Sequence, residues 1–207
     1  PIPSYPLDRA SVNPAESLLF SWLLQSASGT NYDAEWTEIR WTSGTSTDVS
    51  TWNVIKAGSG SSFSFPAYTF PASSTIKWTL RSEATQEYTD GTGQYSATTR
   101  TFTTLGYELK LVRYPSGQNV CSGNQIPVTY TLQTTTKVDV RQTGSKLYWR
   151  TDTTSPYSEI TNSTETKALA FPANTIPTNA TVQWYITVTA ADGSTYSTNP
   201  ATLNTAE

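Results

Sequence analysis

The sequence contains no histidine and no methionine, and only one cysteine, Cys121. Without histidine the chain cannot form a Ser-His-Asp triad, a Cys-His pair or an imidazole metal site. A single cysteine excludes an intrachain disulfide and a cysteine-rich metal cluster. Because methionine is absent, we expect the chain to be a segment or processed product of a longer protein. These absences predict a protein that is not an enzyme and needs no cofactor.

Charge is scarce as well. Charged residues make up 14% of the 207 residues, against ~25% in an average soluble protein. The net charge is −3 and no Lys/Arg cluster is present, so we expect no nucleic-acid partner. No apolar run reaches the ~18 residues of a membrane span, so we expect no membrane insertion. The polar residues that are present include 25 serines and 38 threonines, and threonine favours strands.

Two copies of one unit make up the sequence. Residues 65–80 (FPAYTFPASSTIKWTL) align with residues 171–186 (FPANTIPTNATVQWYI) at an offset of 106. Further upstream the offset is 108, and the aligned aromatic pairs are Trp22 with Tyr130 and Trp41 with Trp149. A unit of about a hundred residues is a typical domain size. We therefore predict two domains, residues 1–105 and residues 106–207, joined by a short connection.

Apolar and polar residues alternate within each copy, as they do in strands with one buried face. The alternating segments are residues 18–24, 39–41, 63–65 and 76–80 in the first copy, and 126–132, 147–149, 169–171 and 182–188 in the second. Asp90-Gly91 and Asp192-Gly193 follow the last of these segments and are typical of hairpin turns. No segment shows a helical period. The fold class predicted is all-β, with a β-sandwich in each copy.

Residues 175–193 (TIPTNATVQWYITVTAADG) resemble the fibronectin type III pattern, in which a proline corner precedes an alternating strand and a glycine turn. Residues 70–84 follow the same pattern, and Trp22 and Tyr130 stand where that family has a core tryptophan. Trp78 and Trp184 depart from the tyrosine usual on the family's sixth strand. The resemblance implies two tandem fibronectin type III-like, immunoglobulin-like β-sandwich domains.

The order of Trp41, Trp52, the Phe-Pro-Ala stop and Pro71 also resembles the fibronectin-like repeats of bacteriophage tail proteins and large bacterial surface proteins. That resemblance implies a non-catalytic structural or attachment module, acting as a spacer or as a segment that binds protein or glycan. The expected location is extracellular, on a bacterial cell surface or in a virion. The expected partners are other modules of the same larger protein and a surface glycan or protein.

Three aromatic residues are candidates for a binding site because they do not share the core pattern. Trp36 has the opposite parity to Ile39 and Trp41, Trp52 stands near a loop, and Tyr88 stands in the turn before Gly91. Exposed aromatic rings can stack on sugars or anchor a protein partner. They support an alternative function, a carbohydrate-binding accessory module of a secreted bacterial enzyme.

Two groups of acidic residues leave a third alternative, a β-rich hydrolase that uses a pair of carboxylates. The groups are Asp33, Glu35 and Glu38, and Glu83, Glu87 and Asp90. The second copy has no equivalent groups, and the Asp-x-Asp spacing of a calcium loop is absent. We therefore predict no catalytic residue and no metal site.

Overall fold

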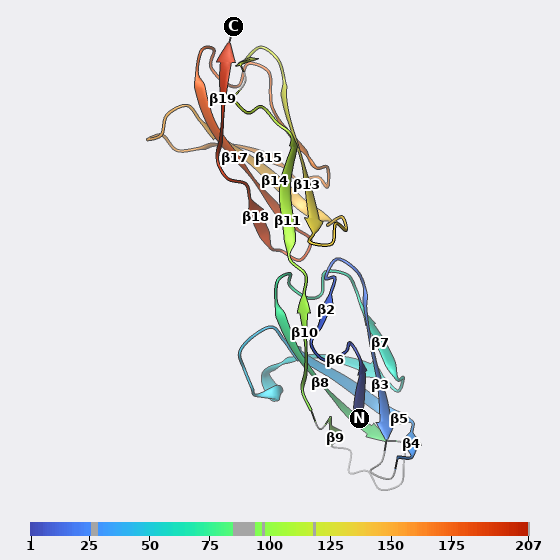
Figure 1. Cartoon of the computed structure of the whole chain (residues 1–207). Helices are drawn as coiled ribbons and strands as arrows, with labels where there is room; N and C mark the ends of the chain where they lie inside the picture. The colour runs from blue at the N-terminus through green and yellow to red at the C-terminus, as the bar shows by residue number, and fades with distance from the viewer. Residues whose placement is uncertain (26–28, 85–93, 97, 118, 207) are drawn as a thin grey trace. The chain divides into compact units, whose positions relative to one another are not determined.

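Strands form almost all the regular structure of the chain, and the predicted all-β class is confirmed (Figure 1). The computed structural model describes all residues except 26–28, 85–93, 97, 118 and 207. Within those residues the helical structure is one short 3-10 turn, η1 (Val49–Thr51). The chain divides into two units, Pro1–Leu105 (unit one) and Gly106–Glu207 (unit two). The boundary lies where the two sequence copies meet.

Unit one is built from two sheets that differ in size. The smaller sheet contains β1 (Ile2–Tyr5), β3 (Leu18–Gln25), β4 (Asn31–Tyr32) and β7 (Ser62–Phe65). The larger sheet contains β2 (Ala10–Val12), β10 (Arg100–Thr104), β8 (Thr75–Ala84), β5 (Ala34–Thr42), β6 (Asn53–Gly58) and β9 (Gln94–Tyr95). Neighbouring strands run antiparallel except β2, which pairs parallel to β10.

Aromatic rings from both sheets meet in the core of unit one. The alternation of β3 buries Leu18, Phe20 and Trp22 on one face of that strand. The ring of Phe20 lies 4.6 Å from that of Trp78 on β8, edge to face, a geometry that aromatic pairs prefer. Phe102 on β10 is also fully buried. The two sheets therefore form a sandwich around a shared hydrophobic core.

Unit two repeats this arrangement with other side chains. Its smaller sheet contains β11 (Tyr107–Arg113), β13 (Ile126–Thr134) and β16 (Ala168–Phe171). Its larger sheet contains β12 (Asn119–Cys121), β19 (Ala201–Ala206), β17 (Thr181–Ala190), β14 (Gln142–Arg150), β15 (Ser158–Asn162) and β18 (Thr195–Ser197). Every second residue of β17 is buried. Trp184, at the centre of β17, packs edge to face on Phe171 with ring centroids 6.2 Å apart.

A buried threonine closes the proline corner in each unit. In unit two, the Thr205 hydroxyl donates a hydrogen bond to the Pro177 carbonyl at 2.6 Å and accepts one from the Ala180 N–H at 2.8 Å. The counterparts in unit one, with the same two distances, are Thr104, Pro71 and Ser74. Buried backbone groups must find partners, and one hydroxyl supplies both here.

The backbone of this corner is repeated too. Tyr68 and Ser73 have φ values of 66° and 53°, and Asn174 and Asn179, at the same offset of 106, have values of 59° and 53°. Left-handed backbone is uncommon outside glycine, so its recurrence at matched positions is a strong sign of shared structure. The alignment of the two copies at this corner is confirmed.

One core position holds a different aromatic residue in each unit. Trp22 is buried in unit one, and the aligned residue in unit two is Tyr130. The Tyr130 hydroxyl donates to the Gln142 side-chain oxygen at 2.9 Å, and Gln142 donates to the Thr166 carbonyl at 3.0 Å. Gln142 aligns with the small residue Ala34. In unit two the smaller ring of Tyr130 is therefore accompanied by a longer polar side chain, Gln142, which accepts the hydrogen bond of the buried Tyr130 hydroxyl.

An exposed ion cluster lies at the start of unit two. The Glu108 carboxylate is 2.8 Å from the Lys137 ammonium and 2.9 Å from the Lys110 ammonium. Hydrogen bonds from Lys137 and Lys110 lower the pKa of Glu108 from 4.5 to about 2. Since the folded pKa lies below the unfolded one, this carboxylate adds stability above about pH 4.5, and that contribution is lost as the pH falls toward about 2.

We expect the Glu108→Gln variant to lose less stability than the wild type as the pH falls from about 4.5 to about 2. The variant should have a lower Tm than the wild type at neutral pH, and the difference should disappear near pH 2, because the wild-type carboxyl is then protonated. Thermal unfolding followed by circular dichroism across pH measures this. The control is Glu16→Gln, at an exposed position in unit one. A Tm difference that stays constant with pH would contradict the assignment.

Candidate functional site

The candidate functional residues lie on the outer faces of the two six-stranded sheets, opposite the hydrophobic cores. Strand register places their outward residues in matching rows across the sheet. In unit one the rows are Trp36–Glu83, Lys56–Glu38–Arg81, Val54–Arg40–Thr79 and Thr42–Lys77. In unit two the rows are Gly144–Thr189, Thr161–Lys146–Thr187, Glu159–Tyr148–Tyr185 and Arg150–Gln183. The same backbone thus presents two different surfaces.

Trp36 is half-buried on the outer face of unit one, next to a bulge in β5. Its indole N–H donates to the buried Glu83 carboxylate at 2.8 Å, and the Arg81 guanidinium lies 5.5 Å from the ring centroid. A hollow of about 370 Å³, lined by Trp36, Glu38 and Lys56 among others, lies beside it. The ring is held by its neighbours, so it is a fixed part of this face.

The charges around Trp36 pair with one another. Glu38 accepts from the Arg40 guanidinium at 3.0 Å, and the Arg81 guanidinium is 3.9 Å away. The Glu38 and Arg40 side chains are 16% and 13% exposed, so this pair is partly shielded from water. The carboxylates of Glu38 and Glu83 are therefore both engaged in contacts within this face.

The prediction that Trp52 is an exposed binding residue is wrong. Trp52 is 6% exposed, so its ring is buried. The preceding turn η1 is capped by Asp48, whose side chain accepts from the Ser50 N–H at 2.9 Å. The Trp52 N–H then bonds the Val49 carbonyl at 3.3 Å, and β6 begins at the next residue. The side chain of this residue near a loop is therefore buried.

Tyr88, the third candidate, lies outside the described residues, as do Glu87, Asp90 and the Asp90-Gly91 turn. Of the three predicted aromatic residues, the structure describes only Trp36 at the surface. In the ranges that the structure covers, no group of three or more Cys, Asp or Glu side chains could hold a metal ion.

The matching face of unit two carries three tyrosines that the sequence analysis missed. Tyr148 and Tyr185 face each other across β14 and β17 with ring centroids 4.9 Å apart and an interplanar angle of 16°. Tyr157 packs edge to face on Tyr185 at 5.0 Å. Burial, with Tyr148 and Tyr157 beside it, raises the pKa of Tyr185. The signal was present, since Tyr148 and Tyr185 have the opposite parity to buried Leu147 and Ile186.

Arg150 fixes one end of this tyrosine cluster (Tyr148, Tyr157 and Tyr185). Its guanidinium lies 4.4 Å from the Tyr157 ring centroid and donates to the Gln183 side-chain oxygen at 3.1 Å. It also donates to the Thr153 carbonyl at 2.7 Å. A cation over a ring face with hydrogen bonds on its edges orders both groups. The cluster is therefore preorganised.

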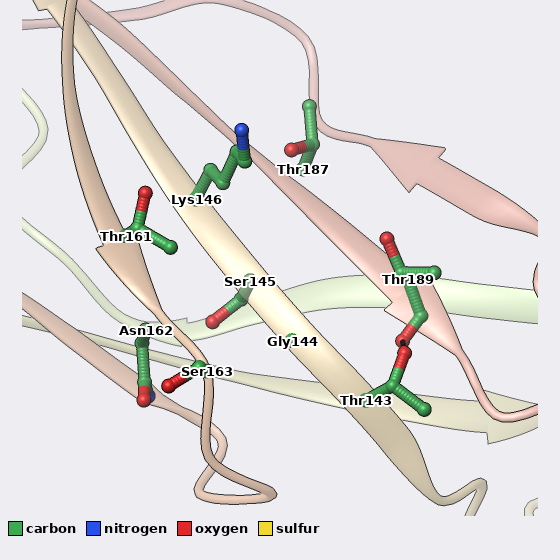
Figure 2. A pocket seen from close by; sticks show the side chains of 9 residues that line it. All are labelled: Thr143, Gly144, Ser145, Lys146, Thr161, Asn162, Ser163, Thr187 and Thr189. Carbon is green, nitrogen blue, oxygen red and sulfur yellow. Dashed lines mark hydrogen bonds between the residues drawn. The ribbon is translucent and has the colours of Figure 1, made fainter.

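A hollow of about 250 Å³ lies at the other end of the same face (Figure 2). Gly144 on β14 occupies the position that Trp36 has in unit one. Figure 2 shows Thr161, Asn162 and Ser163 on one side of β14 and Thr187 and Thr189 on the other, with Lys146 beside them. Hydroxyl groups dominate the lining. We call this space the Gly144 hollow.

An apolar patch covers part of the outer face of the smaller sheet in unit one. Leu19, Leu23 and Ile2 are 49%, 47% and 43% exposed, and Ile2 pairs with Leu23 across β1 and β3. The residues of unit two that align with the two leucines are Pro127 and Thr131. The two units therefore also differ on this face.

No family model and no curated protein matches the sequence. Among solved structures, the chain is similar to the FN1–FN3 domains of chicken CNTN1, with 11% identity, a TM-score of 0.37, and coverage of 100% of this chain and 68% of that one. It is also similar to the fibronectin(III)-like modules of Clostridium thermocellum CbhA, with 9% identity, a TM-score of 0.33, and coverage of 98% and 91%. None of the described helical structure has the length or apolar character needed to cross a bilayer. Both of these solved structures consist of fibronectin type III or fibronectin(III)-like modules.

Proposed function

We propose that the chain is a non-catalytic pair of structural and attachment modules from a larger extracellular protein of a bacterial surface or a virion. Each unit has its own hydrophobic core and its own closed corner, so each can add length to a protein without folding on a neighbour. The apolar patch on β1 and β3 supports contact with another module of the same larger protein.

The observation that carries this proposal is the repetition of framework without repetition of side-chain chemistry. In both units a buried threonine, Thr104 or Thr205, bonds the proline corner, and we call this arrangement the threonine clamp. The clamp and the residues with left-handed backbone recur at matched positions, whereas the outer-face rows differ between the units. A repeated framework with two different surfaces is what we expect of tandem modules that each make their own contacts. Two of the carboxylates that suggested a hydrolase, Glu83 and Glu38, are engaged by Trp36, Arg40 and Arg81.

Pulling the whole chain from both ends in a force spectrometer tests the spacer role. We expect two separate unfolding events, each releasing chain on the order of 300 Å, because each unit has about a hundred residues. Trp184→Ala should remove or weaken only one of the two events, since Trp184 is buried in unit two. A single event for the whole chain would contradict the proposal.

A search for turnover tests the non-catalytic part. The chain is incubated with a panel of glycosidic, ester and peptide substrates, and the products are followed by mass spectrometry. We expect no turnover. Turnover that is lost in Glu83→Gln, with the fold retained, would instead establish the hydrolase alternative, because Glu83 is the buried carboxylate of the described acidic group.

A further inference from the structure

We propose that the outer face of unit two, from the Gly144 hollow to the tyrosine cluster, binds a neutral oligosaccharide. This inference rests on the proposed attachment role and names its ligand class. The rows from Gly144 to Arg150 follow one face of β14 over seven residues, and their six steps of ~3.4 Å span about 20 Å. That length suits an extended chain better than a single small molecule.

Unit two has a glycine in the lining of this hollow at the position where unit one has a tryptophan. Trp36 fills this position in unit one and bonds Glu83. In unit two the aligned residues are Gly144 and Thr189, so both the indole and the carboxylate are gone. The hollow has a volume of about 250 Å³, slightly below the ~300–1,000 Å³ of small-ligand pockets. One sugar ring is a ligand of this scale.

The lining offers hydroxyl groups, which both donate and accept hydrogen bonds. Thr161, Ser163 and Thr187 supply them around Gly144, and Figure 2 shows them gathered about one stretch of β14. Sugar hydroxyls also donate and accept, so the two sets are complementary. Protein interfaces, by contrast, are depleted in serine relative to the rest of the surface. The hollow therefore favours a glycan over a protein segment.

The four rows carry Lys146, Glu159 and Arg150, and the carboxylate of Asp152, which interacts with the Arg150 charge, brings the sum of charges around this face to zero. Lys146 and Glu159 form an ion pair at 2.9 Å, and each stabilises the charged form of the other, raising the pKa of Lys146 and lowering that of Glu159. Arg150 is engaged by Gln183, Tyr157 and a backbone carbonyl. No unbalanced carboxylate or lysine remains in the four rows. A neutral ligand is thus preferred over an acidic one.

The tyrosine cluster supplies the apolar part of the site. Carbohydrate rings have C–H faces that pack on aromatic side chains, while the phenol hydroxyls bond at the edges. Tyr148, Tyr157 and Tyr185 are each partly exposed and fixed by ring contacts and by Arg150. Ordering before binding reduces the entropy lost on binding.

Isothermal titration of the whole chain tests the proposal with named probes: cellohexaose, xylohexaose, mannohexaose and laminarihexaose as neutral ligands, hexagalacturonate as an acidic one, and a proline-rich decapeptide as a protein-like one. We expect at least one neutral hexasaccharide to bind and the acidic probe to bind less tightly. Tyr185→Ala and Tyr148→Ala should each weaken binding about two- to tenfold, by loss of an aromatic contact.

Gly144→Trp is the sharpest variant because it installs the residue that unit one has at this position. The φ of Gly144 is not in the left-handed region, and a Cβ there would meet its nearest neighbour, the Asn162 carbonyl, at 3.4 Å. We expect the variant to fold and to lose detectable binding, since the indole fills the hollow. The control, Val54→Trp at an exposed position on the outer face of unit one, should leave binding unchanged. Circular dichroism checks both folds, and the tyrosine variants give an independent answer if Gly144→Trp does not fold.

Three results would overturn the inference. One is no binding of any neutral hexasaccharide in the panel. Another is binding that survives Gly144→Trp and both tyrosine variants. The third is tighter binding of the peptide than of every sugar at this face, which would assign the surface to a protein partner. Cleavage of a hexasaccharide, seen by mass spectrometry, would instead overturn the non-catalytic function, so failure of the two proposals can be told apart.

Discussion

Replacing Trp184 with alanine is expected to lower the free energy of unfolding of unit two by about 3–5 kcal/mol. Trp184 is fully buried at the centre of β17, where it contacts Phe171 and pairs in register with Trp149. Its indole N–H has no hydrogen-bond partner in the described structure. The loss therefore comes from packing alone, with no buried partner left unsatisfied.

The expected loss is large relative to the ~5–15 kcal/mol that stabilises a typical domain. At roughly 4–8 °C per kcal/mol for a domain of this size, unit two of the Trp184→Ala variant should unfold well below the wild type. Hydrogen exchange read by peptide mass spectrometry separates the units, and we expect residues 1–105 to keep their protection. Trp78→Ala is the matched variant, because Trp78 is the aligned, fully buried residue of unit one. Equal loss of protection in both units from either variant would rule out independent cores.

Replacing Thr205 with valine is the second large effect, about 1–3 kcal/mol. Valine keeps the shape of the side chain but removes the hydroxyl that serves the Pro177 carbonyl and the Ala180 N–H. Thr205 is 5% exposed, so water does not readily replace those bonds. The cost is that of leaving buried backbone groups without partners.

Urea denaturation of single variants measures this cost. Thr104→Val should destabilise unit one by a similar amount, because Thr104 makes the same pair of bonds to its own corner. Thr202→Val, at an exposed position of the same strand as Thr205, is the control and should change stability by less than about 0.5 kcal/mol. If Thr202→Val cost as much as Thr205→Val, strand propensity rather than the clamp would explain the effect.

The candidate site shows how far parity can be used. The sequence analysis correctly placed Trp36 away from the core, because in an alternating strand it lies on the face opposite Ile39. The same argument applied to Tyr148 and Tyr185, whose neighbours Leu147 and Ile186 are buried. They were missed because no single sequence stretch holds both. Only the antiparallel register of β14 and β17 brings them together.

Local sequence failed for Trp52. A residue near a loop is expected to be exposed, and nothing in its neighbours indicates otherwise. The capped turn η1 directly precedes β6, and the indole of Trp52, between the two, is buried. Side-chain direction after a turn depends on the turn geometry, which tertiary packing decides.

The sequence by itself determined the all-β class, the doubled framework and the buried residues of the long strands, because period-two alternation and a repeat are both written in one dimension. The tertiary structure alone decided which outward residues become neighbours. Strand pairing joins residues such as Tyr148 and Tyr185, 37 positions apart, and the Gly144 hollow is lined by residues of β14, β15 and β17. Surfaces form between strands, and no alternation along one strand specifies its partner's register.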